Sequence, residues 1–157
     1  MEGAIGTQLR HVLELLDGDV AKVYAQLGLA EYRPRFSPIV RTLVAKGPLS
    51  IRDLAGAVGV THSAASQTVS QLVRSGFASL EPGADARQRI VHLTPKTRDL
   101  LPTIEAEWQA TTAAMAELDA ELSAPLSIVL TELTAALHAR PFHNRIATQS
   151  PHIIGPL

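Results

Sequence analysis

The chain has 157 residues, is 46% hydrophobic but only 4% aromatic, contains no cysteine and carries a formal net charge of −1. This length suits one domain with a sizeable core, or a protomer that shares its core with a partner, and the lack of cysteine excludes disulfides, thiolate metal sites and thiol redox switches. No apolar run approaches membrane-spanning length and the N-terminus is not signal-like, so we expect a cytoplasmic protein with no membrane partner.

The charge is distributed unevenly along the chain. Residues 50–98 contain six Lys or Arg and three Asp or Glu, whereas residues 99–140 contain one basic and seven acidic residues. A near-neutral net charge, with the positive charges in one segment and the negative charges in another, is compatible with a dimer that binds DNA through one face. It also predicts weaker non-specific binding than a strongly basic protein would show.

The first predicted element is an amphipathic helix within residues 1–36. Apolar side chains recur there at spacings of three, four and seven residues, which is typical of one helix face. This stripe consists of Ile5, Leu9, Val12, Leu16, Val23 and Leu27.

A second helix is predicted to begin at residue 37. Ser37 is a suitable N-cap and Pro38 suits the first helical position. The residues expected to be buried in this helix are Ile39, Val40, Leu43 and Val44.

Residues 50–59 predict a short helix with a defined start and end. Ser50 is a suitable N-cap, and Asp53 lies in the first turn, where a carboxylate is favourable. Gly59 suits the C-terminal turn because glycine tolerates a positive φ. The residues expected to reach the core are Leu54, Ala55, Val58 and, from the turn, Val60.

The next helix, after Thr61 as its N-cap, has two contrasting faces. Its buried stripe is predicted to consist of Ala65, Val69 and Leu72. Its opposite face is polar and consists of His62, Ser63, Ser66, Gln67, Ser70, Gln71 and Arg74. Glutamine can pair with adenine, and hydroxyl groups reach phosphates or base edges, so we predict that Thr61 and this face contact DNA. A polar face that is merely solvated is the alternative.

Residues 77–93 predict a β-hairpin. Residues 77–80 form a short strand candidate, residues 82–85 are strong turn punctuation, and residues 88–93 alternate as the returning strand. Arg87 and Arg89 near the tip suit a narrow minor groove and its phosphates, while Asp85 orients Arg87 or caps the turn. Two helices, a tight turn and a hairpin make a winged helix-turn-helix, which usually places one helix in a DNA major groove. An ordinary exposed hairpin with a surface ion pair is the alternative.

Two motifs in this segment resemble the MarR family of bacterial transcription regulators. Asp85-Ala86-Arg87 resembles the D-x-R signature of the family's wing, and residues 91–96 (VHLTPK) resemble its strand followed by L-T-x-K at the start of a long helix. The resemblance covers about the whole chain in the order and length of its elements. It implies a homodimeric DNA-binding repressor, or less often an activator, that a small ligand releases or modulates.

In the resembled family, a ligand crevice lies between the dimerisation helices and the winged unit. Residues 30–46 would line such a crevice here, and Tyr32, Arg33, Arg35 and Arg41 lie close together in this segment. An arginine there could hold a carboxylate or phenolate. The alternative, of equal weight, is that these arginines are solvated or bind DNA phosphates. The ligand-binding residues therefore stay unassigned.

Residues 95–140 predict two further amphipathic helices. Thr94 caps the first, and Pro95 lies in its first turn. The apolar stripe of the first is spaced like a coiled-coil seam and consists of Leu101, Ile104, Trp108, Thr111, Met115, Leu118 and Leu122. The stripe of the second consists of Leu126, Leu130, Leu133 and Leu137.

One winged unit cannot cover three amphipathic helices. We therefore expect a second copy of the chain to cover them, related by a two-fold axis. An intrachain bundle in a monomer is the alternative. A two-fold dimer predicts a pseudo-palindromic operator in double-stranded DNA, with half-sites roughly 34–36 Å apart.

These elements together predict a mainly α chain with a small β-hairpin wing. The expected parts are an N-terminal dimerisation helix and linker (residues 1–36), a winged helix-turn-helix DNA-binding domain (37–94), C-terminal dimerisation helices (95–140) and a loosely docked tail (141–157).

Nothing in the sequence predicts a catalytic site, a cofactor or a metal site. None of the six histidines lies at i, i+4 beside a glutamate, and there is no nucleophile elbow, phosphate loop or pair of acids. We therefore expect no enzyme activity. Two other classes stay open. One is a winged-helix dimerisation or protein-interaction module without DNA binding, in which Gln67 and Glu81, at positions often basic in the resembled family, are relics. The other is the helical dimerisation part of an enzyme such as a methyltransferase.

Overall fold

The computed structural model describes residues 4–85 and 87–150 of the chain. The chain divides into two compact units, residues 1–108 and residues 109–157, and the long helix α5 (Pro95–Glu121) contributes to both. Each unit is described by itself below.

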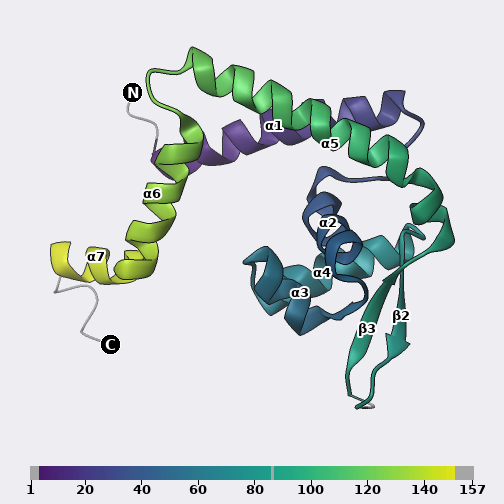
Figure 1. The fold of residues 1–157 in the computed structure, drawn as a ribbon. Helices are drawn as coiled ribbons and strands as arrows, with labels where there is room; N and C mark the ends of the chain where they lie inside the picture. Colours follow the sequence, from purple (N-terminus) through teal and green to yellow (C-terminus); the bar gives the residue numbers. More distant parts are fainter. Residues whose placement is uncertain (1–3, 86, 151–157) are drawn as a thin grey trace. The chain divides into compact units, whose positions relative to one another are not determined.

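The first unit contains the helix-turn-helix and the hairpin (Figure 1). In chain order its elements are α1 (Ile5–Gln26), the 3-10 helix η1 (Pro34–Phe36), α2 (Ser37–Lys46), β1 (Leu49–Ser50), α3 (Ile51–Val58), α4 (His62–Arg74), β2 (Ala78–Pro82), β3 (Arg89–Leu93) and the start of α5. The prediction of a mainly helical chain with a small β-hairpin wing is confirmed.

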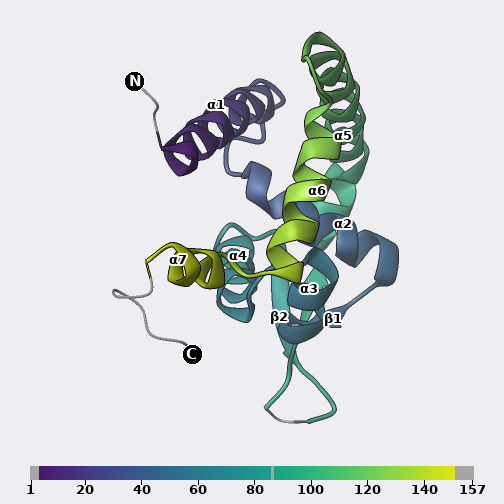
Figure 2. The ribbon, with the colours of Figure 1, turned by 90° about the vertical axis from the view of Figure 1, so that its left-hand side faces the viewer.

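The wing is part of a three-stranded antiparallel sheet with the order β1-β3-β2. Strands β2 and β3 pair along their length, from Ala78 opposite Leu93 to Pro82 opposite Arg89. Strand β1 pairs with the other edge of β3; the sequence did not predict it, because two residues show no alternation. Figure 2 shows the β2–β3 hairpin extending beyond α3.

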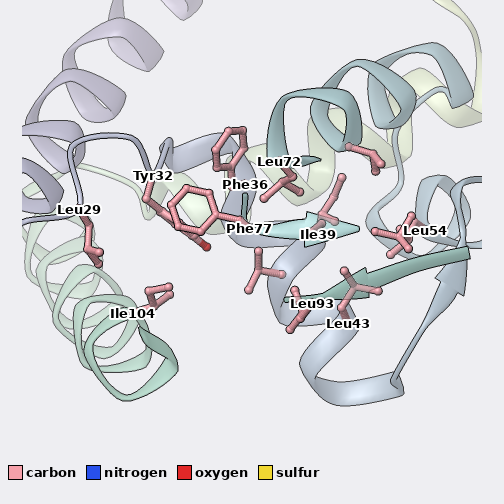
Figure 3. Close-up of a cluster of buried hydrophobic side chains, with 14 of the residues drawn as sticks. Leu29, Tyr32, Phe36, Ile39, Leu43, Leu54, Leu72, Phe77, Leu93 and Ile104 are labelled. Atoms are coloured by element: carbon pink, nitrogen blue, oxygen red, sulfur yellow. The ribbon is translucent and has the colours of Figure 1, made fainter. Parts of the chain in front are cut away.

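The core of the first unit is built around four aromatic side chains. The ring centroid of Tyr32 lies 4.7 Å from that of Tyr24, 5.7 Å from Phe36 and 5.2 Å from Phe77, and the last two pairs meet edge to face. Such pairs contribute about 0.5–1.5 kcal/mol each beyond the area they bury. Figure 3 shows Tyr32, Phe36 and Phe77 in one cluster with leucines and isoleucines from α2, α3, α4 and α5.

The predicted role of Ser37 as an N-cap is wrong. Phe36 occupies the N-cap position of α2, because η1 runs directly into that helix. The hydroxyl of Ser37 instead accepts a hydrogen bond of 2.9 Å from Trp108 Nε1. Pro38 lies in the first turn of α2, as its second residue and not at the predicted first position.

Two side chains predicted to be buried are exposed. Val44, on the outer side of α2, is 41% exposed, and Val60, in the turn before α4, is 42% exposed. The backbone of Val60 is nevertheless held by a hydrogen bond from its amide to the carbonyl of Ala55. The other apolar residues predicted for α2 are buried, as are Leu54 and Ala55 of α3.

The coiled-coil-like seam predicted along α5 is not one continuous face for a partner. Ile104 is fully buried and Trp108 is 9% exposed, and both pack in the core of the first unit. Further along α5, Thr111, Met115 and Leu118 are half-buried. The first part of the stripe therefore binds within the chain.

The second unit consists of the end of α5, α6 (Leu126–Ala139) and α7 (Phe142–Gln149). No residue of α6 or α7 is buried. Because α7 lies within residues 141–157, part of the predicted tail is helical. Arg145 of α7 binds the end of α6: its Nη2 donates to the carbonyl of Ala136 at 2.8 Å, and its Nε donates to the carbonyl of Arg140 at 3.1 Å. The remainder of that tail, residues 151–157, lies outside the described residues.

Within residues 4–85 and 87–150, no single helix has the length and apolar character needed to cross a membrane. Among the helices of these described residues, one bent pair, α5 and α6, passes that test together, on length and composition alone.

Candidate nucleic-acid interface

The helix-turn-helix is fixed at three positions by local backbone contacts. Ser50 Oγ accepts a hydrogen bond of 3.1 Å from the amide of Asp53 at the start of α3. Gly59 ends α3 with a φ of +76°, a left-handed conformation that favours glycine. Thr61 Oγ1 accepts a hydrogen bond of 3.1 Å from the amide of Ala64 and so caps α4. All three predicted roles are confirmed.

Helix α4 buries one face and exposes the other, as predicted. Ala65, Val69 and Leu72 are at most 1% exposed and pack against the rest of the first unit. On α4 and at its N-cap, the predicted contact residues that are exposed are Thr61, His62, Ser63, Gln67, Ser70 and Arg74. A single outward stripe of polar side chains therefore runs along α4.

Two predicted contact residues, Ser66 and Gln71, lie at the edge of this stripe and are half-buried. The amide oxygen Oε1 of Gln71 is enclosed and has no hydrogen-bond partner among the described residues. Gln71 is therefore less available to a ligand than Gln67, which is exposed.

The tip of the wing is organised by Asp85. Its carboxylate Oδ1 accepts a hydrogen bond of 3.0 Å from the backbone amide of Arg87, and its carbonyl accepts one of 2.8 Å from the amide of Gln88. Of the two roles predicted for Asp85, the structure shows the turn-capping one. Arg87 and Arg89 are both exposed, and Ala86 of the D-x-R motif lies outside the described residues.

Glu81, an acidic residue in the wing, lies close to a histidine. Its Oε2 is 3.4 Å from Nε2 of His92, on the neighbouring strand. A pair of this kind between adjacent strands partly offsets the negative charge of Glu81 whenever the histidine is protonated.

The L-T-x-K motif joins the end of α4 to the start of α5. Thr94 Oγ1 donates to the carbonyl of Gly76 at 2.8 Å, and Thr97 Oγ1 donates to that of Phe77 at 2.6 Å. Lys96 Nζ lies 4.6 Å from the ring centroid of Phe77 and donates to the carbonyl of Ser75 at 3.3 Å. Thr94 also caps α5, as predicted, by accepting from the amide of Thr97.

A groove of about 470 Å³ lies between the wing and the beginnings of α3 and α4. Its lining comprises Ser50, Ile51, Arg52, His62, Asp85, Arg87, Gln88 and Arg89. The groove thus brings the first residue of α4 together with both predicted wing arginines. Arg52 was not predicted as a site residue. It is the neighbour of Asp53 on a short helix, and its sequence pattern indicates an ordinary solvent-exposed polar face.

The four residues considered for a ligand crevice are not gathered in one site. Tyr32 is in the aromatic core, and the guanidinium carbon of Arg41 lies 4.4 Å from the ring centroid of Trp108. Arg33 and Arg35 line a separate open hollow of about 530 Å³ between α1 and η1, together with Arg10. The described residues contain no group of three or more His, Asp or Glu placed to hold a metal ion.

No protein-family model matches the sequence, and no curated protein matches it. Solved structures do match. The transcriptional regulator MOSR of M. tuberculosis, in complex with DNA, is 20% identical with a TM-score of 0.67, and the match covers 89% of this chain and all of that one (100%). The PcaV transcriptional regulator of Streptomyces coelicolor, in complex with its natural ligand, is 19% identical with a TM-score of 0.62 over 87% of this chain and 90% of that one.

A MarR family transcriptional regulator from Silicibacter pomeroyi is 23% identical, with a TM-score of 0.55 over 87% of this chain and 88% of that one. At these identities the likeness is one of fold. It extends beyond the winged helix-turn-helix to most of the length of each chain. The described chain has the fold of the MarR-family transcriptional regulators.

Proposed function

We propose that this protein is a sequence-specific DNA-binding transcription regulator. The observation that carries the proposal is the exposed polar stripe of α4, which begins at the same cationic groove that Arg87 and Arg89 line. Base contacts from a helix in the major groove and phosphate or minor-groove contacts from a wing are the two parts of such recognition. The neighbouring structure of MOSR in complex with DNA supports this use of the fold.

We assign distinct roles to the predicted residues. Ser63, Gln67 and Ser70 face the base edges from α4, because they are exposed and lie at spacings of four and three. The remaining contacts, to phosphates or to the minor groove, come from Thr61, His62, Ser66, Gln71, Arg74, Arg87 and Arg89. Cytoplasmic location follows from DNA being the partner.

The regulator acts as a homodimer in this proposal. On α1, Ile5, Leu9 and Val12 are between 41% and 74% exposed, and on α6, Leu130 and Leu133 are 43% and 42% exposed. Large apolar surface of this kind is typical of an interface. A two-fold partner would cover it and place two copies of α4 on a pseudo-palindromic operator, with half-sites roughly 34–36 Å apart.

The protein acts as a repressor whose DNA binding a small anionic ligand modulates. Arg10, Arg33 and Arg35 line the hollow between α1 and η1, and so do two acidic residues, Glu14 and Asp17. The guanidinium groups outnumber the carboxylates by one and could bind the carboxylate of a ligand. The structure of PcaV with its natural ligand supports ligand control in this fold.

The test is a fluorescence anisotropy titration with the DNA upstream of the protein's own gene and with an unrelated duplex of equal length. The wild type is expected to bind the first more tightly, with an affinity that falls steeply as salt rises. Arg87→Ala is expected to bind much more weakly, whereas Arg98→Ala, which removes an equal charge from α5, is expected to bind like the wild type.

The same samples are examined by sedimentation, where every variant should have twice the protomer mass. A wild type that binds no duplex at low salt would contradict the DNA-binding proposal and favour a protein-interaction module. Equal affinity of Arg87→Ala and the wild type would contradict the role of the wing.

A further inference from the structure

The groove between the wing and the helix-turn-helix contains an arginine from an element outside the recognition helix and the wing. Arg52 is the second residue of α3 and is exposed. It lines the same groove as Arg89 of the wing and His62 of α4. Three separate segments of the chain therefore contribute cationic or titratable side chains to one depression.

The acidic residues around this groove are already engaged. Asp53, the neighbour of Arg52, accepts a hydrogen bond of 2.7 Å from Ser50 Oγ at its Oδ2. Asp85 binds the backbone of the wing through Oδ1. Neither forms an ion pair with an arginine within the described residues. The guanidinium groups of Arg52, Arg87 and Arg89 are thus left to an external anion.

The charges of the groove favour a polyanion. Three arginines and one aspartate line it, which leaves an excess of positive charge even with His62 neutral. Arginine presents a planar fork of donors that matches two oxygens of a phosphate. A volume of about 470 Å³ leaves room for phosphodiester groups of one strand.

The position of the groove indicates which phosphates would occupy it. In a helix-turn-helix, the second helix enters the major groove and the first crosses the sugar-phosphate backbone. Here the groove has the start of α4 on one side and the wing on the other. The DNA strand whose backbone separates the major groove from the adjacent minor groove would pass between α4 and the wing.

We propose that this groove seats the DNA backbone between the two grooves, and that Arg52 of α3 is a phosphate-binding residue of the interface. This inference rests on the proposed DNA-binding function and adds a residue and a role to it. Because phosphates are the same in every sequence, Arg52 contributes to affinity and register and not to base selection.

The test compares Arg52→Gln and Arg52→Lys with the wild type on two fluorescein-labelled duplexes of unrelated sequence. Arg52→Gln is expected to lower the affinity for both duplexes by the same factor. Because each protomer of the dimer loses one phosphate contact, it is also expected to reduce the slope of log affinity against log salt by about 2. Loss of two phosphate contacts per dimer means that the ratio of wild-type to Arg52→Gln affinity shrinks about tenfold between roughly 50 mM and 200 mM salt. Arg52→Lys keeps the charge and should retain most of the slope.

Arg98→Gln is the matched control, because it removes the same charge from an exposed site on α5 that has no part in the proposed interface or ligand hollow. Thermal melting of each variant checks that the protein remains folded. If the wild type binds DNA and Arg52→Gln behaves like Arg98→Gln, the role of Arg52 is overturned while the proposed function stands. If Arg52→Gln weakens binding to one duplex only, a phosphate role is likewise overturned. If the wild type binds neither duplex at low salt, both proposals fail.

Discussion

The hydroxyl group of Tyr24 on α1 donates a hydrogen bond to the carboxylate Oε2 of Glu107 on α5, across 83 positions of sequence. Tyr24 is fully buried and Glu107 is only 5% exposed. A charged group at such a site is costly unless its oxygens are bound. This contact therefore ties α1 to the part of α5 that packs in the first unit.

Ser37 extends this contact into a small polar network. Its hydroxyl binds Tyr32 at 3.5 Å, lies 3.4 Å from the Tyr24 hydroxyl and accepts from Trp108 Nε1 at 2.9 Å. Four elements, α1, the loop before η1, α2 and α5, thus meet at one group of polar atoms inside an aromatic core.

Removing the hydroxyl of Tyr24 should destabilise the fold. In Tyr24→Phe, the buried carboxylate of Glu107 loses one donor, and we expect the free energy of unfolding to fall by about 1–3 kcal/mol. Urea denaturation followed by circular dichroism measures this. Lys22→Ala, which breaks an ion pair with Asp19 whose two side chains are each 76% exposed, serves as the control and should change little. A Tyr24→Phe variant as stable as this control would contradict the structural role of the network.

The two buried tyrosines should make stability sensitive to alkaline pH. Burial raises the pKa of Tyr24 and the pKa of Tyr32 above the ordinary value of 10.0. The folded state therefore retains protons that the unfolded state releases above about pH 10. Their contribution to stability is complete below that pH and is lost as pH rises toward the folded-state pKa values.

The measurement is the denaturation midpoint of the wild type and of the Tyr24→Phe/Tyr32→Phe double variant between pH 8 and 11. Above pH 10, the stability of the wild type should fall more steeply than that of the double variant. If the two midpoints fall in parallel, the phenol groups do not cause the loss of stability at alkaline pH.

The helix-turn-helix was predictable because its signals are local. Ser50, Gly59 and Thr61 each act on backbone groups within four or five residues, so the type and spacing of these residues determine the helix ends. The alternation of buried and exposed residues on α4 follows in the same way from a helical period.

The remaining features depend on contacts between distant segments. Serine is a residue type that often caps helices, but the hydroxyl of Ser37 accepts a hydrogen bond from Trp108, which is 71 positions away. The apolar spacing of α5 predicted one continuous stripe, of which only Ile104 and Trp108 are buried, and it could not reveal that Ile104 packs within the chain. Strand β1 and the place of Arg52 beside the wing likewise depend on how β3 pairs, which no local pattern specifies.

Loss of the cap at the start of α4 should be measurable. Thr61→Ala removes the acceptor for the amide of Ala64, and we expect a loss of about 1 kcal/mol in unfolding free energy. Thr68→Ala is the matched control, because its hydroxyl only donates to the carbonyl of Ala64 within the same helix. Chemical denaturation of both variants gives the comparison. Equal stability of the two would mean that Thr61 does not cap α4 in solution.

In the second unit, Asp119 near the end of α5 should hold the beginning of α6. Its Oδ2 accepts a hydrogen bond of 2.6 Å from Ser127 Oγ, and its Oδ1 accepts one of 2.9 Å from the amide of Leu126. The hydroxyl of Ser127 is the main cause that lowers the pKa of Asp119 below its ordinary value of 3.8. The contact therefore stabilises the turn at neutral pH, and it is lost as pH falls below about 3.8 through the folded-state pKa.

Asp119→Ala should speed hydrogen exchange at the amides of Leu126 and Ser127 at neutral pH, because the start of α6 loses its acceptor. Glu117→Gln, at an exposed position two residues before Asp119 on α5, is the control and should leave these amides unchanged. Exchange followed by NMR or mass spectrometry separates the two variants. If Asp119→Ala exchanges at the wild-type rate, then α6 begins without help from α5, and its first turn must be stabilised by contacts outside these two helices.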